Sequence, residues 1–599
     1  MERVADYIIR KLCDAGVRHI FMIAGRGVLF LTDAVAKEER IQGISTYHEQ
    51  GASYAAMAYA RATGGLSACL VSTGCAATNA ITAALCAWQD SLPVVFISGQ
   101  HMLEETTAHT GLRIRTYGSQ EADIVRIVKP ITKYAVMLEN AEDVAEEVEK
   151  ALFMAQDGRQ GPVWIDVPLD IQNMRVEPSE MKHLYSKRTL GQADMDIQGD
   201  VRFVAAGMEH AKRPIILIGG GIRSSKAGRV LQDLVERCRI PLVFTSSAAD
   251  VYGSSHELSI GAAGALGGSR PGNFALQNSD YVLAIGTRLC SQLTGTDYDR
   301  FARDAHVVVV DIDAEEHKKK EVRKDRLIVS DARNFLEQLV QENIPSSEES
   351  WVQKCLQWKD VFSISKEPFV LDMKEKNQLD LYAFSDAMSE VLPHEATVIT
   401  DAGFEELIVP STIRYRDGQQ CIFPSAQGAM GFAIPAVLGT YFAGREQIVV
   451  VVGDGSIMMN LQELLAIQHH AIPVKIFVIQ NDMYAVIRRR QKDLFRRRTI
   501  GNDFSDGLAA PDFKRISDCF GFKYRKLEGV DSLVTALTDL MQEEGQIICE
   551  VACTPDQPYL HKSYGINEAG RMSYRPLEEL SPFLDRDVWV QEMLIPTAD

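Results

Sequence analysis

Short runs of apolar, β-branched residues recur along the whole chain, and helix-like patterns separate them. Each run has the length of one strand, and several end at Gly or Asp; the clearest are 70–74, 94–99, 163–168, 215–221, 307–313, 449–455 and 475–482. Continuous apolar runs of this kind are typical of parallel strands buried on both faces, with helices as the crossovers. The sequence therefore predicts an α/β fold built from doubly wound parallel sheets.

The chain has 599 residues, which is too long for a single hydrophobic core. Two polar stretches without apolar periodicity, 175–200 and 341–378, are interpreted as linkers. They divide the chain into three α/β domains followed by a turn-rich tail. The expected limits are 1–172, 200–340, 378–557 and, for the tail, 558–599.

Composition argues against several classes of function. The net charge of −18 disfavours general nucleic-acid binding, because an acidic surface repels phosphate. The cysteines include no CxxC pair, so no zinc site is expected, and a reduced, cytoplasmic protein fits best. The N-terminus has the pattern of an amphipathic helix rather than a signal peptide, and no apolar run is long enough to span a membrane.

One strand–turn–helix segment carries the most specific motif. The strand ends in Gly453-Asp454-Gly455-Ser456, so backbone N–H groups and a positive helix end face the carboxyl edge of the sheet, a place that suits a diphosphate. The next strand brings Asn481 to the same edge. Carboxylate and amide oxygens are ligands for Mg²⁺, which takes about six oxygens and readily accepts two from a diphosphate. A plain strand–helix turn would explain the glycines alone, but not the spacing to Asn481.

This spacing matches the thiamin diphosphate signature, in which GDG is followed, across a helix and a strand, by an Asn pair; Gln480 replaces the first Asn here. Other segments resemble those of acetolactate synthases and their relatives, namely 47–64, 72–88, 160–172, 213–221, 286–295, 307–313 and 425–439. The resemblance implies a pyrimidine-binding domain, a middle domain and a domain that binds the diphosphate with Mg²⁺. It also implies that the main-chain carbonyl of Met483 is a third metal ligand.

The resemblance assigns roles near the rings of the cofactor. Glu49, in the segment HEQGA, would hydrogen-bond to N1′ of the aminopyrimidine and favour the tautomer that removes the thiazolium C2 proton. The alternative for Glu49 is an acid at a helix N-terminus. Met430 would support the bent cofactor, and the alternative there is a core methionine. Gly428 would let the backbone approach the pyrimidine.

Two further groups of residues follow from the resemblance. Gly403 matches a glycine on the diphosphate side of the site. Phe404 and Glu405 replace the Gln and His that follow this glycine in the family, so part of the family's contact with the diphosphate is altered. Gln120 and Gly27 would help to position the substrate.

Arginines stand near the expected substrate. Arg490 falls where acetolactate synthases carry Trp, Ser119 falls where they have Phe, and Arg26 lies in the loop that they fill with Gly-Gly-Ala. Because guanidinium groups match carboxylate and phosphate, we expect a larger, anionic acceptor, phosphorylated or linked to a nucleotide. Neutralising Arg490 and Arg498, in the basic run 488–498, is expected to raise KM for this acceptor. The alternative for this run is a solvated helix face.

A closer resemblance is to acetolactate synthase-like proteins of bacterial surface-polysaccharide pathways, some of which transfer an acetyl unit from pyruvate to a keto-sugar nucleotide. It rests on 113–136, 270–289, 501–513 and 575–586.

FAD is a possible third cofactor, because many relatives hold it against the middle domain. The residues at the expected flavin contacts are the segment 261–273, Arg288, Asp311 and Asp313. His469 and His470 do not match the active-site His pair of related decarboxylases and are interpreted as structural.

The favoured hypothesis is a thiamin diphosphate- and Mg²⁺-dependent enzyme that decarboxylates a small 2-oxo acid, with pyruvate as the first choice, and joins the acyl unit to a carbonyl acceptor. Because Glu49 and Asp454 lie in different domains, the family's arrangement across two subunits implies a homodimer or a homotetramer. The alternatives are acetolactate synthase proper, a flavin-linked 2-oxo acid oxidase, and a non-catalytic cofactor-binding protein. The intact Glu49, Asp454 and Asn481 disfavour the last of these.

Overall fold

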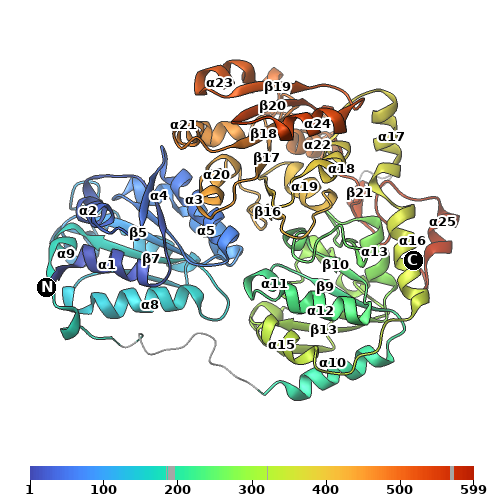
Figure 1. Ribbon diagram of the computed structural model, residues 1–599, viewed down its shortest axis with the longest axis horizontal. Helices are drawn as coiled ribbons and strands as arrows, with labels where there is room; N and C mark the ends of the chain where they lie inside the picture. The colour runs from blue at the N-terminus through green and yellow to red at the C-terminus, as the bar shows by residue number, and fades with distance from the viewer. Residues whose placement is uncertain (184, 186–195, 320–321, 567–571, 599) are drawn as a thin grey trace.

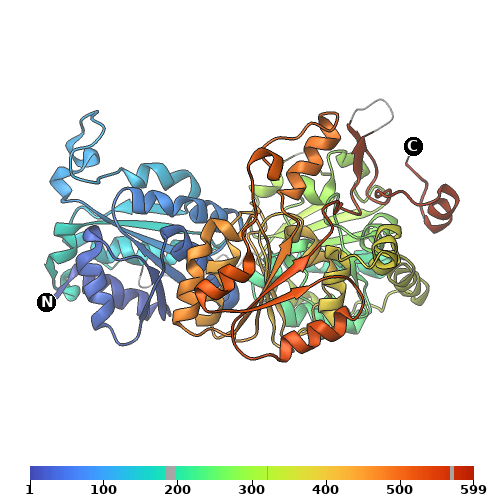
Figure 2. The ribbon, with the colours of Figure 1, turned by 90° about the horizontal axis from the view of Figure 1, so that it is seen from above.

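Three six-stranded parallel sheets with helices packed against them form the structure, which is a computed structural model (Figure 1). It describes the chain except for residues 184, 186–195, 320–321, 567–571 and 599. The predicted α/β fold of doubly wound parallel sheets is confirmed. In Figures 1 and 2 the N-terminal lobe, in blue, lies to one side of the other two lobes. Within the described part of the chain, no helix has both the length and the apolar character needed to cross a bilayer.

The N-terminal lobe contains the strand order β3-β2-β4-β5-β7-β6. Its strands are β2 (His19–Met22), β3 (Gln42–Ser45), β4 (Ser67–Val71), β5 (Val94–Gln100), β6 (Tyr134–Met137) and β7 (Val163–Pro168). Its helices are α1 (Val4–Asp14), α2 (Leu29–Lys37), α3 (Glu49–Thr63), α4 (Cys75–Asn79), α5 (Ile81–Gln89), α6 (Thr107–Thr110), α7 (Ile124–Val128), α8 (Val144–Gln156) and α9 (Leu169–Asn173). The short β1 (Glu2–Arg3) pairs antiparallel with β8 (Arg175–Val176).

The middle lobe contains the strand order β11-β10-β9-β12-β13-β14. Its strands are β9 (Pro214–Ile218), β10 (Leu242–Phe244), β11 (Ser259–Ala262), β12 (Tyr281–Ile285), β13 (His306–Asp311) and β14 (Arg326–Val329). Its helices are α10 (Gln198–His210), α11 (Gly221–Ser224), α12 (Gly228–Cys238), α13 (Arg270–Asn278), α14 (Ser291–Thr294), α15 (Ala332–Leu339) and α16 (Glu349–Val361).

The C-terminal lobe contains the strand order β16-β15-β17-β18-β20-β19. Its strands are β15 (Thr397–Ile399), β16 (Gln420–Ile422), β17 (Ile448–Gly453), β18 (Val474–Gln480), β19 (Lys523–Leu527) and β20 (Ile547–Ala552). Its helices are α17 (Pro368–Glu375), α18 (Leu381–Val391), α19 (Glu405–Thr412), α20 (Ala433–Phe442), the 3₁₀ helix η10 (Ile457–Glu463), α21 (Leu464–His469), α22 (Ala485–Leu494), α23 (Phe513–Phe520) and α24 (Leu533–Gln542).

The strand order reverses at one point in the N-terminal and C-terminal sheets. In the first sheet the reversal lies between β2 and β4, and in the last it lies between β15 and β17. Loops that leave adjacent strands in opposite directions open a crevice at the carboxyl edge of the sheet, where ligands bind in folds of this kind. Gly27 follows β2, Gly403 follows β15 and Asp454 follows β17, so some of the predicted site residues of each lobe lie at these points.

The interpretation of 341–378 as a linker is wrong. This stretch contains α16 and α17, and α16 buries Trp351, Cys355 and Trp358 against the middle sheet. The indole Nε1 of Trp351 donates to the carbonyl of Pro214 at 2.9 Å. Spacings of four and three residues place these three side chains on one face of a helix, so a short apolar stripe is enough to bind an otherwise polar segment.

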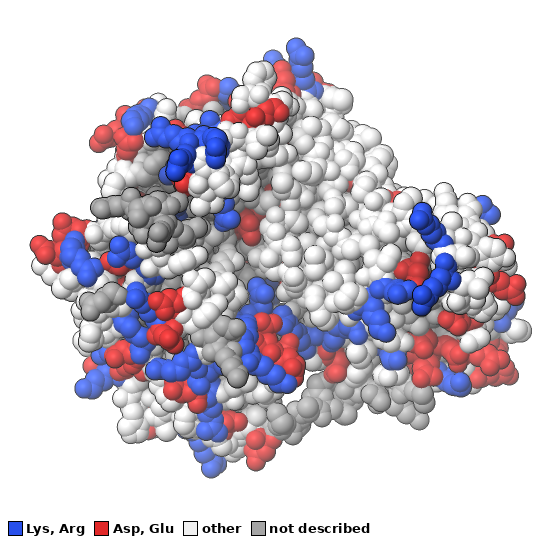
Figure 3. All heavy atoms as spheres, turned by 180° about the vertical axis from the view of Figure 1, so that it is seen from behind, with Lys and Arg blue, Asp and Glu red and all other residues white. Residues whose placement is uncertain are grey.

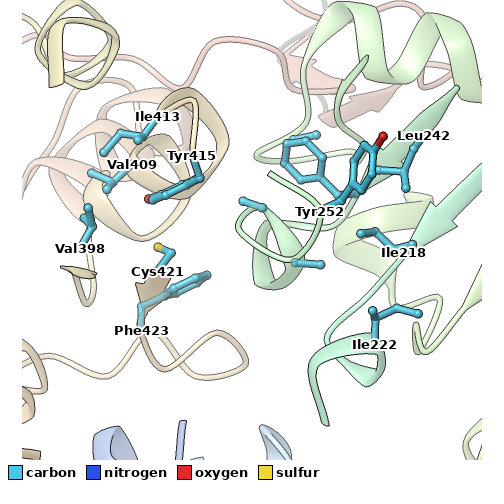
Figure 4. Packing of buried hydrophobic residues seen from close by; sticks show 14 of the residues in the cluster. Ile218, Ile222, Leu242, Tyr252, Val398, Val409, Ile413, Tyr415, Cys421 and Phe423 are labelled. Atoms are coloured by element: carbon cyan, nitrogen blue, oxygen red, sulfur yellow. The ribbon is translucent and has the colours of Figure 1, made fainter. Parts of the chain in front are cut away.

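Hydrophobic contacts join the three lobes. One cluster continues from the middle sheet, through Ile218 and Tyr252, to Tyr415 and Phe423 of the C-terminal lobe (Figure 4). A second cluster joins the N-terminal and C-terminal lobes, because α3, rich in alanine, packs against α20. The helix that begins at Glu49 is therefore fixed to the C-terminal lobe of the same chain.

The tail folds back onto the middle lobe. It contains the antiparallel pair β21 (Tyr564–Ile566) and β22 (Met572–Tyr574) and the helix α25 (Arg586–Glu592). The buried guanidinium of Arg270 donates from Nε to Glu367 Oε1 at 2.6 Å and from Nη1 to the carbonyl of Leu580 at 3.0 Å. His561 contacts the same Glu367 oxygen at 2.8 Å. Burial opposes ionisation of Glu367, but the hydrogen bonds from His561 and Arg270 prevail and lower its pKa to about 2.

Replacing Arg270 with methionine is expected to leave Glu367 buried without its main cationic partner and to free the tail. Removing one partner of a buried ion pair costs about 3–5 kcal/mol, so the free energy of unfolding should fall by that order. Urea titration followed by tryptophan fluorescence measures the change, and limited proteolysis reports release of the tail. Arg333→Met is the control, because its partner Glu337 lies at the surface. An Arg270→Met protein with an unchanged urea midpoint would contradict this role.

Candidate active site

A cavity of about 1280 Å³ lies at the carboxyl ends of β15 and β17. We call it the C-terminal cavity. It is lined by every residue of the third domain that was predicted to bind the cofactor or the metal. These residues are Gly403, Gly428, Met430, Gly453, Asp454, Gly455, Ser456, Asn481 and Met483.

Asp454 and Asn481 lie side by side because β17 and β18 are parallel neighbours. Asp454 is only 3% exposed, and its Oδ2 accepts the backbone N–H groups of Asn481 at 2.9 Å and Asp482 at 2.6 Å. The N–H of Met483 donates to Asn481 Oδ1 at 3.3 Å. Burial raises the pKa of Asp454 to about 6, and the two N–H donors only partly offset it. Both of these hydrogen bonds use Oδ2, so Oδ1 is the oxygen that the carboxylate can offer to a cation.

The donor set suits magnesium. It offers a carboxylate from Asp454, an amide oxygen from Asn481 and a main-chain carbonyl from Met483, which are all hard oxygen ligands. Among the residues that the structure describes, no three His, Cys, Asp or Glu side chains form a metal cage. A cation at this place would therefore complete its coordination with oxygens of a bound diphosphate or water.

The turn after β17 is held by a second buried acid, Asp401. The hydroxyl of Ser456 donates to Asp401 Oδ2 at 2.7 Å and accepts the N–H of Gly431 at 3.0 Å. Burial raises the pKa of Asp401 to about 6, and its Oδ1 is buried without a partner in the described part of the chain. This arrangement fixes the loop from which η10 begins.

Two glycines keep the walls of the cavity clear. Gly403 and Gly428 adopt φ angles of +100° and +54°, which disfavour any residue with a Cβ. A Cβ at Gly403 would collide with the carboxyl of Glu405, and one at Gly428 with the carboxyl of Glu406. The half-buried Met430 lines the same wall.

Glu405 and Glu406, at the start of α19, also line the cavity. From the sequence, Glu405 was noted only as a departure from the family, and Glu406 was not singled out. Burial, reinforced by Asp401 and Asp454, raises the pKa of Glu405 to about 8. Burial, reinforced by Asp401 and Asp90, raises the pKa of Glu406 to about 7, and Arg490 opposes this shift. The signal available in the sequence was two adjacent acids directly after a strand end and a glycine.

The N-terminal candidates gather at the carboxyl edge of their own sheet. The N–H of Gly27 donates to Ser72 Oγ at 3.2 Å. Gln120 adopts a positive φ of 64° and brings its carbonyl against Gly74. Arg26, beside Gly27, is exposed.

Glu49 begins α3 and is half-buried. Its Oε2 accepts a hydrogen bond from Asn79 Nδ2 at 2.9 Å. The backbone N–H groups of Tyr47 and His48, directly before it, both donate to Glu463 Oε1 at 3.0 Å. The residues that line the C-terminal cavity span 265–583, so the structure does not bring Glu49 into the cavity of its own chain.

The arginines of the basic run 488–498 lie in different environments. Arg488 is bound to Asp503 at 2.8 Å, whereas Arg489 and Arg490 line the C-terminal cavity. Arg498 is exposed and does not line it. Lys562 and Tyr564 of the tail face the cavity as well, and neither was singled out from the sequence.

A second cavity of about 1000 Å³ lies at the carboxyl ends of the middle sheet. It is lined by the glycines 219–221, Arg288 and Asp311, whereas Asp313 is instead paired with Arg159 at 2.9 Å. We call it the middle-domain cavity. His469 and His470 line neither cavity; their rings contact each other, and His470 packs on Phe442.

Three successive parts of the chain match the thiamine pyrophosphate (thiamin diphosphate, TPP) enzymes. Residues 2–127 match the N-terminal TPP binding domain, 201–339 the central domain, and 401–551 the C-terminal TPP binding domain.

Among known proteins, the chain is 30% identical over 552 residues to the acetolactate synthase large subunit of Lactococcus lactis subsp. lactis (strain IL1403), covering 91% of each chain. It is 30% identical over 552 residues to the acetolactate synthase large subunit of Haemophilus influenzae, covering 91% of this chain and 93% of the relative. It is 29% identical over 548 residues to the acetolactate synthase isozyme 3 large subunit of Escherichia coli (strain K12), covering 90% and 92%. The chain therefore belongs to the thiamine pyrophosphate enzymes, as a TPP-dependent, acetolactate synthase-like enzyme of the carboligase or lyase type.

Proposed function

We propose that this enzyme decarboxylates pyruvate and joins the remaining acyl unit to the carbonyl carbon of an anionic acceptor larger than pyruvate. One observation carries the choice of acceptor: three cationic side chains, those of Arg489, Arg490 and Lys562, line the same cavity as the metal-side residues Asp454 and Asn481. Decarboxylation and carboligation are supported by the likeness to the acetolactate synthase large subunits.

The residues of the C-terminal cavity would hold thiamin diphosphate through Mg²⁺. Asp454, Asn481 and the carbonyl of Met483 would bind the cation, and the backbone after β17 would face the diphosphate. The cavity walls at Gly403 and Gly428, which carry no side chain, would leave room for the rings of the cofactor. When bound, the cofactor supplies the electron sink that decarboxylation of a 2-oxo acid requires.

A second copy of the chain would complete the site by supplying Glu49, and we propose a homodimer, or a homotetramer built from two such dimers. The support is the absence of residues 1–172 from the lining of the C-terminal cavity. Figure 3 shows a broad area almost free of Lys, Arg, Asp and Glu on one face of the molecule. Met458 and Met459, on the helix after Gly455, are 44% and 49% exposed in the single chain.

The cations at the cavity form few ion pairs. Arg489 pairs with Asp493 at 3.4 Å, and Arg490 makes no ion pair with any residue that the structure describes. Burial lowers the pKa of Lys562; Asp493 opposes this shift, and the positive charges of Arg489 and Arg490 add to it. A carboxylate or phosphate between these three groups would relieve their mutual repulsion.

Two rival functions are separated by one experiment. Acetolactate synthesis, with pyruvate as its own acceptor, is favoured by the likeness to acetolactate synthase large subunits. A flavin-linked oxidase is favoured by the middle-domain cavity with its three glycines. The purified protein would be incubated with Mg²⁺, thiamin diphosphate and pyruvate, with and without phosphorylated or nucleotide-linked ketones. Acetolactate as sole product in every reaction would contradict our acceptor, and oxygen uptake would identify the oxidase.

Replacing Asp454 with alanine is expected to weaken thiamin diphosphate binding by about 100-fold or more, because even supporting residues of metal sites contribute roughly 10–100-fold. Isothermal titration with the cofactor and Mg²⁺ measures the loss. Asp506→Asn, at an exposed acid of the same lobe, is the control and should bind as the unaltered protein does. Equal affinity in Asp454→Ala would remove the proposed metal site.

Replacing Arg490 or Lys562 with methionine is expected to raise KM for the anionic acceptor by roughly 10-fold each, since one charge-assisted hydrogen bond contributes about 1.5–3 kcal/mol. CO₂ release from pyruvate alone should stay unchanged. Steady-state kinetics with each substrate varied in turn measures both effects. Arg498→Met is the matched control, because this arginine lies outside the cavity. A KM shift in Arg498→Met equal to that in Arg490→Met would mean that the effect is general electrostatics.

A further inference from the structure

Glu406 lies on the wall of the cavity, and the proposed function gives it no part in binding the metal, the cofactor or the acceptor. It is the second residue of α19, and its half-buried carboxyl packs against Gly428 on the wall of the C-terminal cavity. No residue in the described ranges forms a hydrogen bond or an ion pair with this carboxyl. Arg490, also on the cavity wall, acts on it electrostatically. The carboxyl thus lies between the wall that would receive the pyrimidine and the cationic wall that would receive the acceptor.

The groups around Glu406 favour a carboxyl that holds a proton. Burial of the carboxyl is the main cause, and the negative charges of Asp401, in the loop after β15, and Asp90, directly after α5, act in the same direction. The positive charge of Arg490 acts in the opposite direction. Burial and the two acids outweigh Arg490, so the pKa of Glu406 rises to about 7. The neighbouring phenol of Tyr559 is already engaged, because it donates to the carbonyl of Gly403 at 2.8 Å.

The other acids that line the cavity are placed for different tasks. Asp454 and Glu405 lie on the metal side, where Glu405 contacts Gly453. Asp493 pairs with Arg489 on α22. Glu406 is therefore the acid whose position fits a proton transfer to a molecule bound beside Arg490.

We propose that Glu406 is the catalytic acid that protonates the carbonyl oxygen of the acceptor during carbon–carbon bond formation, an inference that rests on the proposed function. As the donor-derived acyl carbon bonds to the carbonyl carbon, the π electron pair of the acceptor's C=O moves onto oxygen. That oxygen takes the proton from Glu406, which becomes a carboxylate beside Arg490. Water at the cavity mouth returns the proton before the next cycle.

The test uses Glu406→Gln, which keeps the size of the side chain but cannot release a proton. CO₂ release from pyruvate should continue, whereas ligation to the acceptor should fall by about 100-fold, the lower range for loss of a general acid. Free acetaldehyde should accumulate instead. Glu395→Gln, at an exposed acid of the same lobe, should alter neither step. Calorimetric binding of thiamin diphosphate establishes that the Glu406→Gln site is folded.

A second readout needs no cofactor and no turnover. The infrared C=O stretch of a protonated carboxyl should appear in the difference between the unaltered apoprotein and Glu406→Gln at pH 5, and it should vanish as the pH rises through about 7. The corresponding Glu405→Gln difference should vanish at about pH 8. Absence of the Glu406 band at every pH, or ligation by Glu406→Gln at the unaltered rate, would overturn this inference alone. Failure of the unaltered protein to release CO₂ from pyruvate would overturn the proposed function and this inference with it.

Discussion

The parallel pairing of β17 with β18 determines where chemistry can occur in this chain. Gly453 is in register with Ile479, so the residues that follow these two strands leave the sheet together. Asp454 then binds the N–H groups of the loop that carries Asn481, and two metal-side oxygens face one cavity. Because the strand order reverses between β15 and β17, the neighbouring loop, with Gly403 and α19, forms the opposite wall.

Acids that form no ion pair with the described residues lie in and directly behind the C-terminal cavity. The pKa values of Asp401 and Asp454 rise to about 6, and those of Glu406 and Glu405 to about 7 and 8, chiefly because burial disfavours the charged form. A carboxyl with a raised folded-state pKa stabilises the fold below its unfolded pKa, and this contribution is lost as the pH rises through the folded value. The cofactor-free protein should thus be less stable at pH 8 than at pH 5, and a divalent cation beside Asp454 would offset part of the loss.

What the sequence could predict depended on whether the signal was local. The GDG turn and Asn481 were accessible because each lies at the end of an apolar strand, and parallel strands share an edge. Glu406 was not recognised, and the burial of Glu405 was not foreseen, because two acids at a helix start are usually solvated and only the packing of the third lobe buries them. The run 488–498 could not show that Arg490 faces the cavity whereas Arg488 binds Asp503. The linker interpretation of 341–378 failed because a few buried residues spread through a polar segment give too weak a pattern.

The contact between Glu463 and the backbone before Glu49 physically connects the proposed metal-side turn with the residue proposed to act on the pyrimidine. The helix that follows Gly455 ends at Glu463, whose carboxylate holds the N–H groups of Tyr47 and His48. Within one chain, the turn proposed to face the diphosphate of one site and the acid proposed to serve another are therefore joined by a single short helix and two hydrogen bonds. In a homodimer with two shared sites, a displacement of η10 when one cavity is filled would move the Glu49 that completes the other. The packing of α3 on α20 limits that displacement, so the two sites of such a dimer are held at a fixed separation by the same contacts that stabilise each subunit.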